Sequence, residues 1–379
     1  MKPKVVYWNN IPAPYMVERF NVLADRGNMD FEAWFNERTH SDRSWEVEEE
    51  KWRFPYQYMP SLNIFGRRFR FPLPLFRGKL PDVLTSLYAE PVFLIGWIIA
   101  KLRGVRTAFW CQVTTDRWVK RREWKNKIKR LVFLRVDATF GSGEESRIFA
   151  MRYGTPDNRA FCLRHSIDVE HYTKGRQKVL PERGNIRKKL GLHGIVFIYV
   201  GRLWWGKGVN YLLDAFRDLQ NRIDREISLL IVGDGVDEVA LKEQCRSEGV
   251  RNVVFAGFKQ KAELPRYYAA SDVFVFPTLG DPYGLVIDEA MASCLPVIST
   301  SSAGEIRDRI EDGVNGYIVP PEDSLALCNA MEKLVFDSQR RTEMGKASMK
   351  KIAGHTHEQW AKDFELLIQC VMSQGELNK

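Results

Sequence analysis

The sequence predicts an α/β protein of two domains, each with a parallel sheet that carries helices on both faces. The chain has 379 residues, and about 150 residues per domain gives roughly two domains. Short apolar runs of strand length alternate with longer segments whose apolar residues have helical spacing. Hydrophobic residues make up 45% of the chain and charged residues 28%, which provides enough apolar side chains for two cores.

The first half of the chain, residues 1–175, is predicted as one domain because strands and helices alternate along it. Apolar, β-branched and aromatic runs predict its strands, and apolar residues at helical spacing predict its first helix. The predicted strands are Val5–Trp8, Phe31–Phe35, Val83–Leu87, Thr107–Trp110, Ala138–Phe140 and Ala160–Leu163, and the helix is Val17–Arg26. Residues 52–80 are rich in aromatic residues, arginine and proline, and are predicted as loops and short strands.

A charged stretch from Glu170 to Gly184 has no apolar period and is predicted as a linker. A second alternating domain follows over residues 185–355, and residues 356–379 form a final segment with helical apolar spacing. The predicted elements of the second domain are strands Ile195–Val200, Ile227–Val232, Val253–Phe255, Val273–Phe276, Pro296–Thr300 and Tyr317–Val319, and helices Val209–Leu219 and Val286–Ser293.

The overall charge and composition narrow the classes of partner. The net charge of +9 favours phosphorylated substrates, nucleic acid or an acidic membrane surface. No recognised nucleic-acid-binding module is present, so we do not expect nucleic acid as a partner. The six cysteines form neither a C-x-x-C motif nor a Cys/His cluster, so we expect no structural zinc and no disulfide framework. The longest apolar run, Pro91–Ala100, is far below the ~20 residues that span a bilayer, and the N-terminal run is too short for a signal peptide. We therefore expect a cytoplasmic protein.

The segment Gly201–Gly208 places two cations at the end of a predicted buried strand. Glycines allow the backbone to turn sharply and approach a ligand closely. Arg202 can grip a phosphate with its planar fork, and Lys207 adds a point charge. The spacing also matches most of a P-loop, but Gly208 stands where a P-loop needs a serine or threonine hydroxyl for Mg²⁺. A nucleotide hydrolase is therefore one alternative, and a tight turn with two surface cations is another.

The segment Asp281–Ala290 places unpaired backbone N–H groups and two carboxylates at a predicted helix start. The helix begins near Gly284, and its first N–H groups carry the positive end of the helix dipole. Asp281 precedes the helix, and Glu289 lies about one and a half turns into it. The alternative interpretation has Asp281 as an acid near the N-cap and Glu289 as a solvated helix residue. Cations and N–H groups suit a diphosphate, and carboxylates suit sugar or ribose hydroxyls, so the two segments together indicate a nucleotide-sugar.

With these motifs the chain resembles the retaining nucleotide-sugar glycosyltransferases of family 4, which have the GT-B fold. The resemblance depends on six segments in the same order and at compatible spacing: Val200–Gly208, Ile231–Gly235, Val254–Gly257, Asp281–Ala292, Pro296–Ile298 and Asp312–Tyr317. It implies two Rossmann-like doubly wound domains that face each other across a cleft. It also implies that the last helix crosses back to the N-terminal, acceptor-binding domain.

The resemblance also implies roles for individual residues. Arg202 and Lys207 would clamp the donor diphosphate, the N–H groups of Gly284 and Leu285 would cap it, and Glu289 would accept hydrogen bonds from the ribose. Three further donor-binding positions are Gly201, Gly233 and Phe258. Asp281, counted with the catalytic residues, stands where the family has a glutamate and would face the transferred sugar.

The N-terminal half departs from the family at the sugar site. Many members have a histidine just after a strand there, but the matching stretch Phe109–Asp116 has none. Asp116 is the candidate catalytic substitute, although a surface acid paired with nearby arginines explains it as well. Asn10 and Tyr15, in the turn after the first strand, and His165 are candidate acceptor contacts. Alternatively, the prolines of that turn only fix its shape, and His165 is a packed histidine.

The reaction implied is transfer of a hexose from a UDP- or GDP-sugar to a glycan or lipid-linked glycan, with retention. Such a reaction suits cell-envelope polysaccharide synthesis, for example of lipopolysaccharide. The chain has no D-x-D motif, so we expect no metal and no other cofactor; fixed cations and N–H groups would stabilise the leaving diphosphate. A non-catalytic glycan- or membrane-binding descendant of the fold is a further alternative, beside the hydrolase.

Residues 117–135 contain nine lysines or arginines and one glutamate, with apolar residues on another helix face. A basic amphipathic helix of this kind suits an anionic membrane surface, which would make the protein peripheral at the inner face of the membrane. Residues 65–77 add a similar mixture of aromatic and basic residues. An ordinary domain helix with solvated cations is the alternative.

Overall fold

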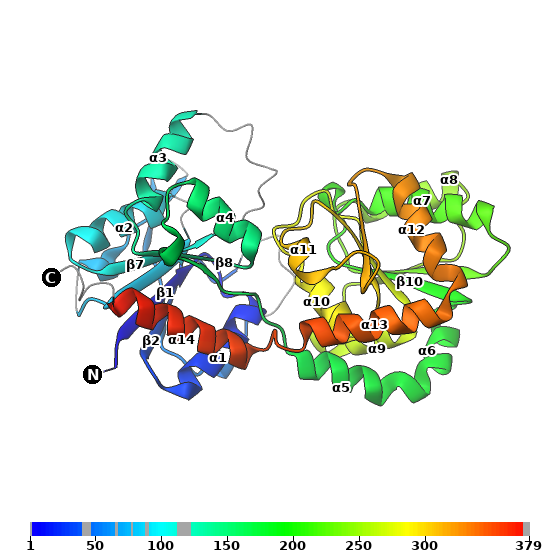
Figure 1. Ribbon diagram of the computed structural model, residues 1–379, viewed down its shortest axis with the longest axis horizontal. Coiled ribbons are helices and arrows are strands. Elements are labelled where there is room, and N and C mark those ends of the chain that lie inside the picture. The colour runs from blue at the N-terminus through cyan, green and yellow to red at the C-terminus, as the bar shows by residue number, and fades with distance from the viewer. Residues whose placement is uncertain are drawn as a thin grey trace. The chain divides into compact units, whose positions relative to one another are not determined.

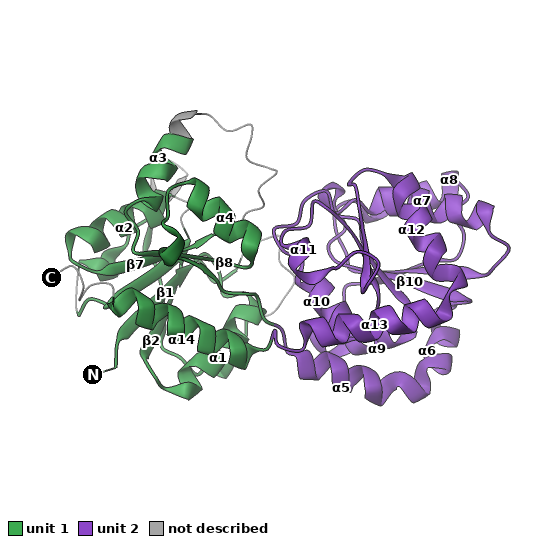
Figure 2. Ribbon diagram, in the orientation of Figure 1, with its two compact units in different colours: residues 1–166, 356–379 green, residues 167–355 purple. Residues whose placement is uncertain are grey.

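The computed structural model divides the chain into two compact units. Unit 1 comprises Met1–Ser166 and Thr356–Lys379, and unit 2 comprises Ile167–His355 (Figure 2). The structure describes residues 2–39, 47–64, 67–76, 79–87, 91–111 and 123–373. Asp116, residues 117–122 of the basic segment, and residues 65–66 and 77 of the aromatic–basic stretch lie outside the described residues.

Unit 1 contains a seven-stranded parallel sheet with the strand order β3-β2-β1-β6-β7-β8-β9, and a separate antiparallel hairpin of β4 and β5. Its elements are β1 (Lys4–Asn9), α1 (Pro14–Arg26), β2 (Asp30–Phe35), β3 (Tyr56–Tyr58), β4 (Ser61–Ile64), β5 (Arg67–Arg70), β6 (Val83–Leu87), α2 (Pro91–Leu102), β7 (Arg106–Cys111), α3 (Glu123–Phe133), β8 (Ala138–Gly141), α4 (Glu144–Arg152), β9 (Ala160–Cys162) and α14 (His357–Ser373).

Helices cover both faces of this sheet because alternate strand residues point to opposite sides. Tyr7 and Trp110 face a core that includes residues of α1 and α14, and Figure 1 shows α14 in red beside α1 in blue. Trp8 and Phe109 face the other side, where α2, α3 and α4 pack. The C-terminal helix therefore packs with the N-terminal half of the chain.

Unit 2 contains a six-stranded parallel sheet with the order β12-β11-β10-β13-β14-β15 around one continuous core. Its elements are α5 (Val169–Val179), α6 (Arg183–Leu190), β10 (Ile195–Val200), α7 (Val209–Arg222), β11 (Ile227–Val232), α8 (Glu238–Ser247), β12 (Val253–Gly257), α9 (Leu264–Ala270), β13 (Val273–Phe276), α10 (Leu285–Ala292), β14 (Val297–Thr300), α11 (Ile306–Arg309), β15 (Gly316–Val319), α12 (Ser324–Phe336) and α13 (Ser338–Ile352). The predicted α/β class, with two parallel sheets, is confirmed.

The predicted linker over residues 170–184 is wrong, because most of this segment is helical. Helix α5 begins after Asp168, whose carboxylate accepts a hydrogen bond from the His171 N–H at 2.9 Å. Tyr172 is the one residue of α5 that is fully buried, so the segment shows no apolar period in the sequence. The boundary between the units accordingly lies before α5, between Ser166 and Ile167.

Both sheets have a point where the strand order reverses. In unit 1 this point lies between β1 and β6, and in unit 2 it lies between β10 and β13. Ligands of open α/β sheets bind at the carboxyl ends of the strands beside such a point. The loops that follow β1, β10 and β13 are therefore the places where a ligand site is expected.

Candidate functional site

The loops that follow β10 and β13 meet in the structure. The loop after β10 contains a short 3₁₀ turn, Trp205–Lys207. The Leu279 N–H, in the loop after β13, donates to the Gly206 carbonyl at 3.0 Å, and the Thr278 hydroxyl donates to the same oxygen at 3.2 Å. The Lys207 ammonium also forms an ion pair with the Asp281 carboxylate. The two sequence motifs thus form one polar site at the carboxyl edge of the sheet, beside the reversal of strand order.

Lys207 and Asp281 are both largely shielded from solvent, with side-chain exposures of 14% and 15%. Burial would raise the pKa of Asp281, but the Lys207 ammonium and a hydrogen bond from the Tyr283 N–H at 2.9 Å outweigh it and hold the pKa below its ordinary value. The Lys207 ammonium also lies over the Phe276 ring, 5.4 Å from its centroid. An ammonium has three N–H donors, so Lys207 can keep Asp281 and still bind an anion.

The other predicted residues of this edge occupy three neighbouring loops. Arg202 is exposed, and its guanidinium lies 6.0 Å from the centroid of the Trp204 ring. The N–H of Gly201 donates to the Val232 carbonyl at 3.0 Å, and the N–H of Gly233 donates to the Gly257 carbonyl at 2.9 Å. Phe258 directly follows β12 and is exposed. The backbone bonds tie the loops after β10, β11 and β12 into one continuous rim.

Helix α10 starts against this rim. Gly284 is its N-cap, with φ of 75°, and a Cβ at this position would lie 2.8 Å from the Phe276 ring, so the close approach requires glycine. Leu285 is the first helical residue, and the first N–H groups of a helix have no acceptor inside it. The helix start is therefore able to bind an anion beside Lys207.

A buried ion pair that the sequence did not reveal holds this helix start in place. The Arg309 guanidinium binds the Asp288 carboxylate at 3.0 Å, and both side chains are almost fully buried. Arg309 also donates to the carbonyls of Tyr283, Gly284 (3.1 Å) and Gly304 (2.8 Å). One side chain thus connects helix α10, the turn before it and the loop after β14. A cation in the short, polar segment Ile306–Arg309 carries no signal in the sequence that predicts this role.

Glu289 is held by two tyrosines from other helices. The Tyr268 hydroxyl of α9 donates to its carboxylate at 2.9 Å, and the Tyr172 hydroxyl of α5 also hydrogen-bonds to it. Burial raises the pKa of Glu289 from 4.5 to about 7, although the tyrosines and Lys261 act in the opposite direction. Glu289 is half-buried, and tyrosine hydroxyls hold its carboxylate, so the interpretation as a solvated helix residue is wrong.

A substitution at Gly208 tests how closely the loop after β10 packs against the loop after β13. Its φ is 66°, and a Cβ there would lie 2.1 Å from the Pro277 carbonyl oxygen. Gly191 has the same left-handed conformation, with φ of 67°, but its Cβ would meet open space. We expect Gly191→Ala to lower the free energy of unfolding by about 1–2 kcal/mol through backbone strain alone. Gly208→Ala is expected to cost about 1–3 kcal/mol more, because the β13 loop must move. Equal costs in urea denaturation would show that the two loops are not packed as described.

The predicted residues of unit 1 lie in two places: Asn10 in the turn after β1, and Tyr15 in contact with His165. Asn10 follows β1, and its side-chain oxygen accepts a hydrogen bond from Asn36 at 2.8 Å. Asn36 is itself fixed, because its own oxygen accepts a hydrogen bond from the Trp8 indole at 2.9 Å. The side chain of Asn10 is thus oriented by a buried network at the carboxyl end of β1.

Tyr15 and His165 contact each other, with ring centroids 5.6 Å apart. His165 is 2% exposed, packs against Trp110, and has its Nδ1 3.0 Å from the Arg19 guanidinium. Arg19 is also buried and lies over the Tyr15 ring. This geometry agrees with the interpretation of His165 as a packed histidine.

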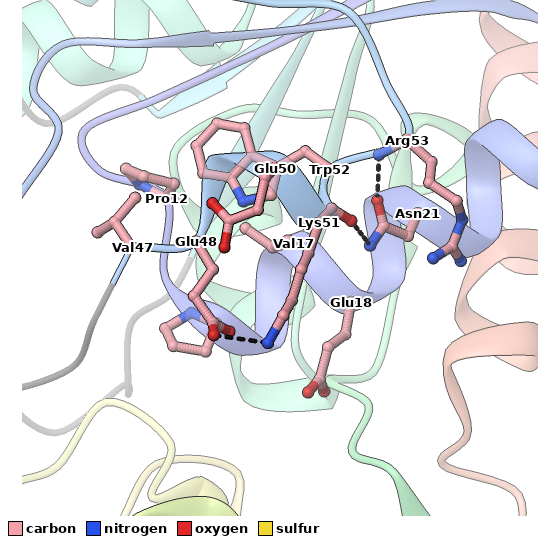
Figure 3. A pocket seen from close by; sticks show the side chains of 11 residues that line it. Pro12, Val17, Glu18, Asn21, Val47, Glu48, Glu50, Lys51, Trp52 and Arg53 are labelled. Atoms are coloured by element: carbon pink, nitrogen blue, oxygen red, sulfur yellow. Dashed lines mark hydrogen bonds and ion pairs between the residues drawn. The ribbon is translucent and has the colours of Figure 1, made fainter.

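The turn after β1 also borders a cavity of about 520 Å³ within unit 1. Figure 3 shows Pro12, Glu50 and Trp52 around it, with α1 on one side. Asn21 of α1 connects the walls: its amide nitrogen donates to the Lys51 carbonyl at 3.1 Å, and its oxygen accepts from the Arg53 N–H at 2.8 Å. The cavity combines an indole, prolines and carboxylates, which suits a polar ligand with an apolar face.

The role predicted for Asp116 and the predicted absence of a metal both remain predictions. Asp116 lies outside the described residues, so its role as a substitute for the family histidine stays a prediction. Among the residues that the structure describes, no three His, Cys, Asp or Glu side chains form a group that could hold a metal ion.

Comparison with known proteins identifies the relatives of this chain. Residues 182–351 match the family model described as "Glycosyl transferases group 1". An uncharacterized glycosyltransferase of Methanocaldococcus jannaschii is 33% identical over 188 residues, 49% of this chain and 47% of that protein. The D-inositol 3-phosphate glycosyltransferase of Corynebacterium diphtheriae is 30% identical over 232 residues, 59% of this chain and 53% of that protein. The chain spans about half the length of these curated relatives.

Solved structures resemble the chain over nearly its whole length. The HepE protein of Anabaena in complex with UDP superposes with a TM-score of 0.78 at 17% identity and covers 97% of this chain and 99% of its own. The sucrose-phosphate synthase of Thermosynechococcus elongatus gives 0.74 at 17% identity, with 98% and 100% covered. At such identities the likeness establishes the fold alone. The chain has the GT-B fold of two Rossmann-like α/β units, and residues 182–351 match the group 1 glycosyltransferase family.

Proposed function

We propose that the protein is a glycosyltransferase that moves a hexose from a UDP- or GDP-sugar to a glycan or lipid-linked glycan. The observation that carries this proposal is the meeting of the two motifs, with Lys207 paired to Asp281 beside the start of α10. The family match over residues 182–351 supports it. So does the structural likeness to HepE, a protein solved with UDP.

In this proposal unit 2 binds the donor. Lys207 and Arg202 bind the diphosphate, and the N–H groups of Gly284 and Leu285 cap it at the helix start. Glu289 accepts hydrogen bonds from the ribose hydroxyls. Gly201 and Gly233 permit close approach of the backbone, and Phe258 offers an exposed ring to the base.

The chemistry follows from the charge that develops on the leaving diphosphate. Fixed cations and helix N–H groups stabilise that charge without reorganisation, so the reaction needs no metal and no cofactor in this proposal. The acceptor hydroxyl attacks on the face that the diphosphate leaves, and the diphosphate takes its proton, which gives retention as in family 4. Asp281 faces the transferred sugar, and its contact with Lys207 couples sugar binding to diphosphate binding.

Unit 1 binds the acceptor in this proposal. Asn10 begins the turn after β1, and Pro12 of that turn borders the cavity that Trp52 and Glu50 line. An indole with neighbouring carboxylates suits a sugar ring and its hydroxyls. The substrate class implies a role in cell-envelope polysaccharide synthesis, such as that of lipopolysaccharide, at the cytoplasmic face of a membrane.

Donor binding should depend on pH through Glu289. Only the carboxylate form accepts two hydrogen bonds from ribose hydroxyls, and its pKa is raised to about 7. Affinity for the nucleoside diphosphate is therefore expected to rise roughly tenfold between about pH 6 and pH 8, the ratio of the ionised fractions. Glu289→Gln is the control in calorimetric titrations, since it retains only the titration of the ligand's own phosphate. An identical pH profile in this variant would contradict the role of Glu289.

A thermal-shift screen tests the proposed function. The panel contains UDP, GDP and ADP, their common sugar conjugates and ATP, each with and without Mg²⁺. A ligand at 100 times its dissociation constant adds about 2.7 kcal/mol of stability. Metal-independent stabilisation by one nucleoside diphosphate is expected and identifies the base. Stabilisation only by ATP with Mg²⁺ would favour a nucleotide hydrolase, and no stabilisation would favour a non-catalytic binding protein.

A further inference from the structure

Helices α2 and α3 of unit 1 expose large apolar side chains in ordered stripes. On α2, Ile95, Ile98 and Leu102 are exposed by 48%, 50% and 81%, at spacings of three and four residues that place them on one side of the helix. On α3 and just beyond it, Ile128, Leu131 and Leu134 are exposed by 44–50%. A single exposed leucine or isoleucine is common on a protein surface. Two rows of them on neighbouring helices form a larger apolar surface, and a surface of this kind marks a site that binds another molecule.

Both stripes belong to the same layer of unit 1. Trp97 of α2 and Val132 and Phe133 of α3 are buried in one cluster, together with Phe109 of the sheet. Figure 1 shows α2 and α3 on the same side of the sheet, opposite α1 and α14. The prediction that the apolar residues of 117–135 lie on one helix face is therefore corrected, because Val132 packs on the sheet while Leu131 is exposed.

The charge around the stripes is mostly positive. Residues 91–111 and 126–135 include no aspartate or glutamate, although α3 begins at Glu123 and Asp137 follows the second stripe. Lys127, Arg130, Arg135 and Arg103 are exposed next to the apolar side chains. Lys101 is paired with Asp137 at 2.9 Å and is largely neutralised. The surface formed by the two stripes and these four cations, named here the α2–α3 surface, is thus apolar and positively charged.

We propose that the α2–α3 surface docks on an anionic lipid bilayer. Apolar side chains enter the interface while the surrounding cations meet acidic headgroups, which is the pattern of monotopic binding. A second copy of this chain fits less well, because a two-fold contact would bring the same cations together. Among the described helices, none is long and apolar enough to cross a membrane. The proposal deepens the proposed function, on whose membrane location it rests, and it can be tested separately because docking requires neither donor nor acceptor.

Vesicle co-sedimentation of the full chain, without nucleotide, tests this proposal. One vesicle type is phosphatidylcholine alone, and the other is an equal mixture of phosphatidylcholine and phosphatidylglycerol. The protein is expected to bind the mixed vesicles, to bind the neutral ones at least tenfold more weakly, and to dissociate as salt is raised. Ile98→Ser with Leu102→Ser is expected to weaken binding to the mixed vesicles at least tenfold, and so is Lys127→Glu with Arg130→Glu.

Two control variants match these changes elsewhere on the protein. Leu366→Ser removes a leucine that is 58% exposed on α14, across the sheet from α2. Lys350→Glu with Lys351→Glu makes the same charge change on exposed positions of α13. Both controls are expected to bind like the parent protein, and unchanged melting temperatures verify folding. The proposal is overturned if the parent protein does not bind mixed vesicles or if the α2 and α3 variants bind as the controls do. Loss of a dimer in those variants, without vesicle binding by the parent, would assign the surface to a second copy instead.

Discussion

Replacing Arg309 with methionine is expected to lower the free energy of unfolding by about 3–5 kcal/mol, the usual cost of leaving a buried charge without its partner. The variant leaves the Asp288 carboxylate fully buried and removes the donors to the Tyr283, Gly284 and Gly304 carbonyls. Chemical denaturation at neutral pH measures the loss. Because Arg309 fixes the start of α10, nucleoside diphosphate affinity should fall in the same variant.

Arg307 provides the matched control, because it lies on the same short helix and is exposed. Arg307→Met should change stability by no more than about 0.5 kcal/mol, as surface substitutions usually do. A double variant, Arg309→Met with Asp288→Leu, should be more stable than Arg309→Met alone, since no unpaired charge remains. Equal losses for Arg309 and Arg307 would mean that the buried ion pair does not hold the helix start.

Lys207→Ala is expected to reduce turnover of the nucleotide-sugar at least tenfold, or about 1.4 kcal/mol in the transition state. The variant removes a cation from the diphosphate and also leaves the Asp281 carboxylate without its partner, so that a negative charge then repels the leaving group. Glu289→Ala is expected to cause a loss of at least the same size through the ribose. Release of nucleoside diphosphate measures both effects.

Lys242→Ala is the control for the lysine variant. Lys242 lies on α8 of the same unit and forms an ion pair with Glu238 one turn earlier in the helix. It should leave turnover unchanged. Parent-like turnover in Lys207→Ala, with a parent-like melting temperature, would remove Lys207 from the site.

The sequence predicts the sheets better than the contacts between their loops. The strands Ile195–Val200, Ile227–Val232 and Val273–Phe276 are confirmed residue for residue, because continuous buried runs are strong strand signals. Helix α5 was not predicted, because it buries too little of its surface to produce an apolar period. Polar helices of this kind are recognised only when the elements against which they pack are known.

The candidate site shows the same limit. Glycine turns and strand ends predict that Lys207 and Asp281 lie at one edge of the sheet, and the structure confirms that they do. Their direct ion pair joins residues that are far apart in the sequence, and no spacing rule predicts it. Arg309 and the tyrosines that hold Glu289 act through tertiary contacts alone, so the sequence gives no sign of their roles.

A crystal structure of the protein with the nucleoside diphosphate that stabilises it most, grown with a metal chelator, tests the donor site. We expect the diphosphate between the Lys207 ammonium and the N–H groups of Gly284 and Leu285, with the ribose hydroxyls on Glu289. A diphosphate bound elsewhere, or no binding until Mg²⁺ is restored, would contradict the donor site and its metal-independent chemistry.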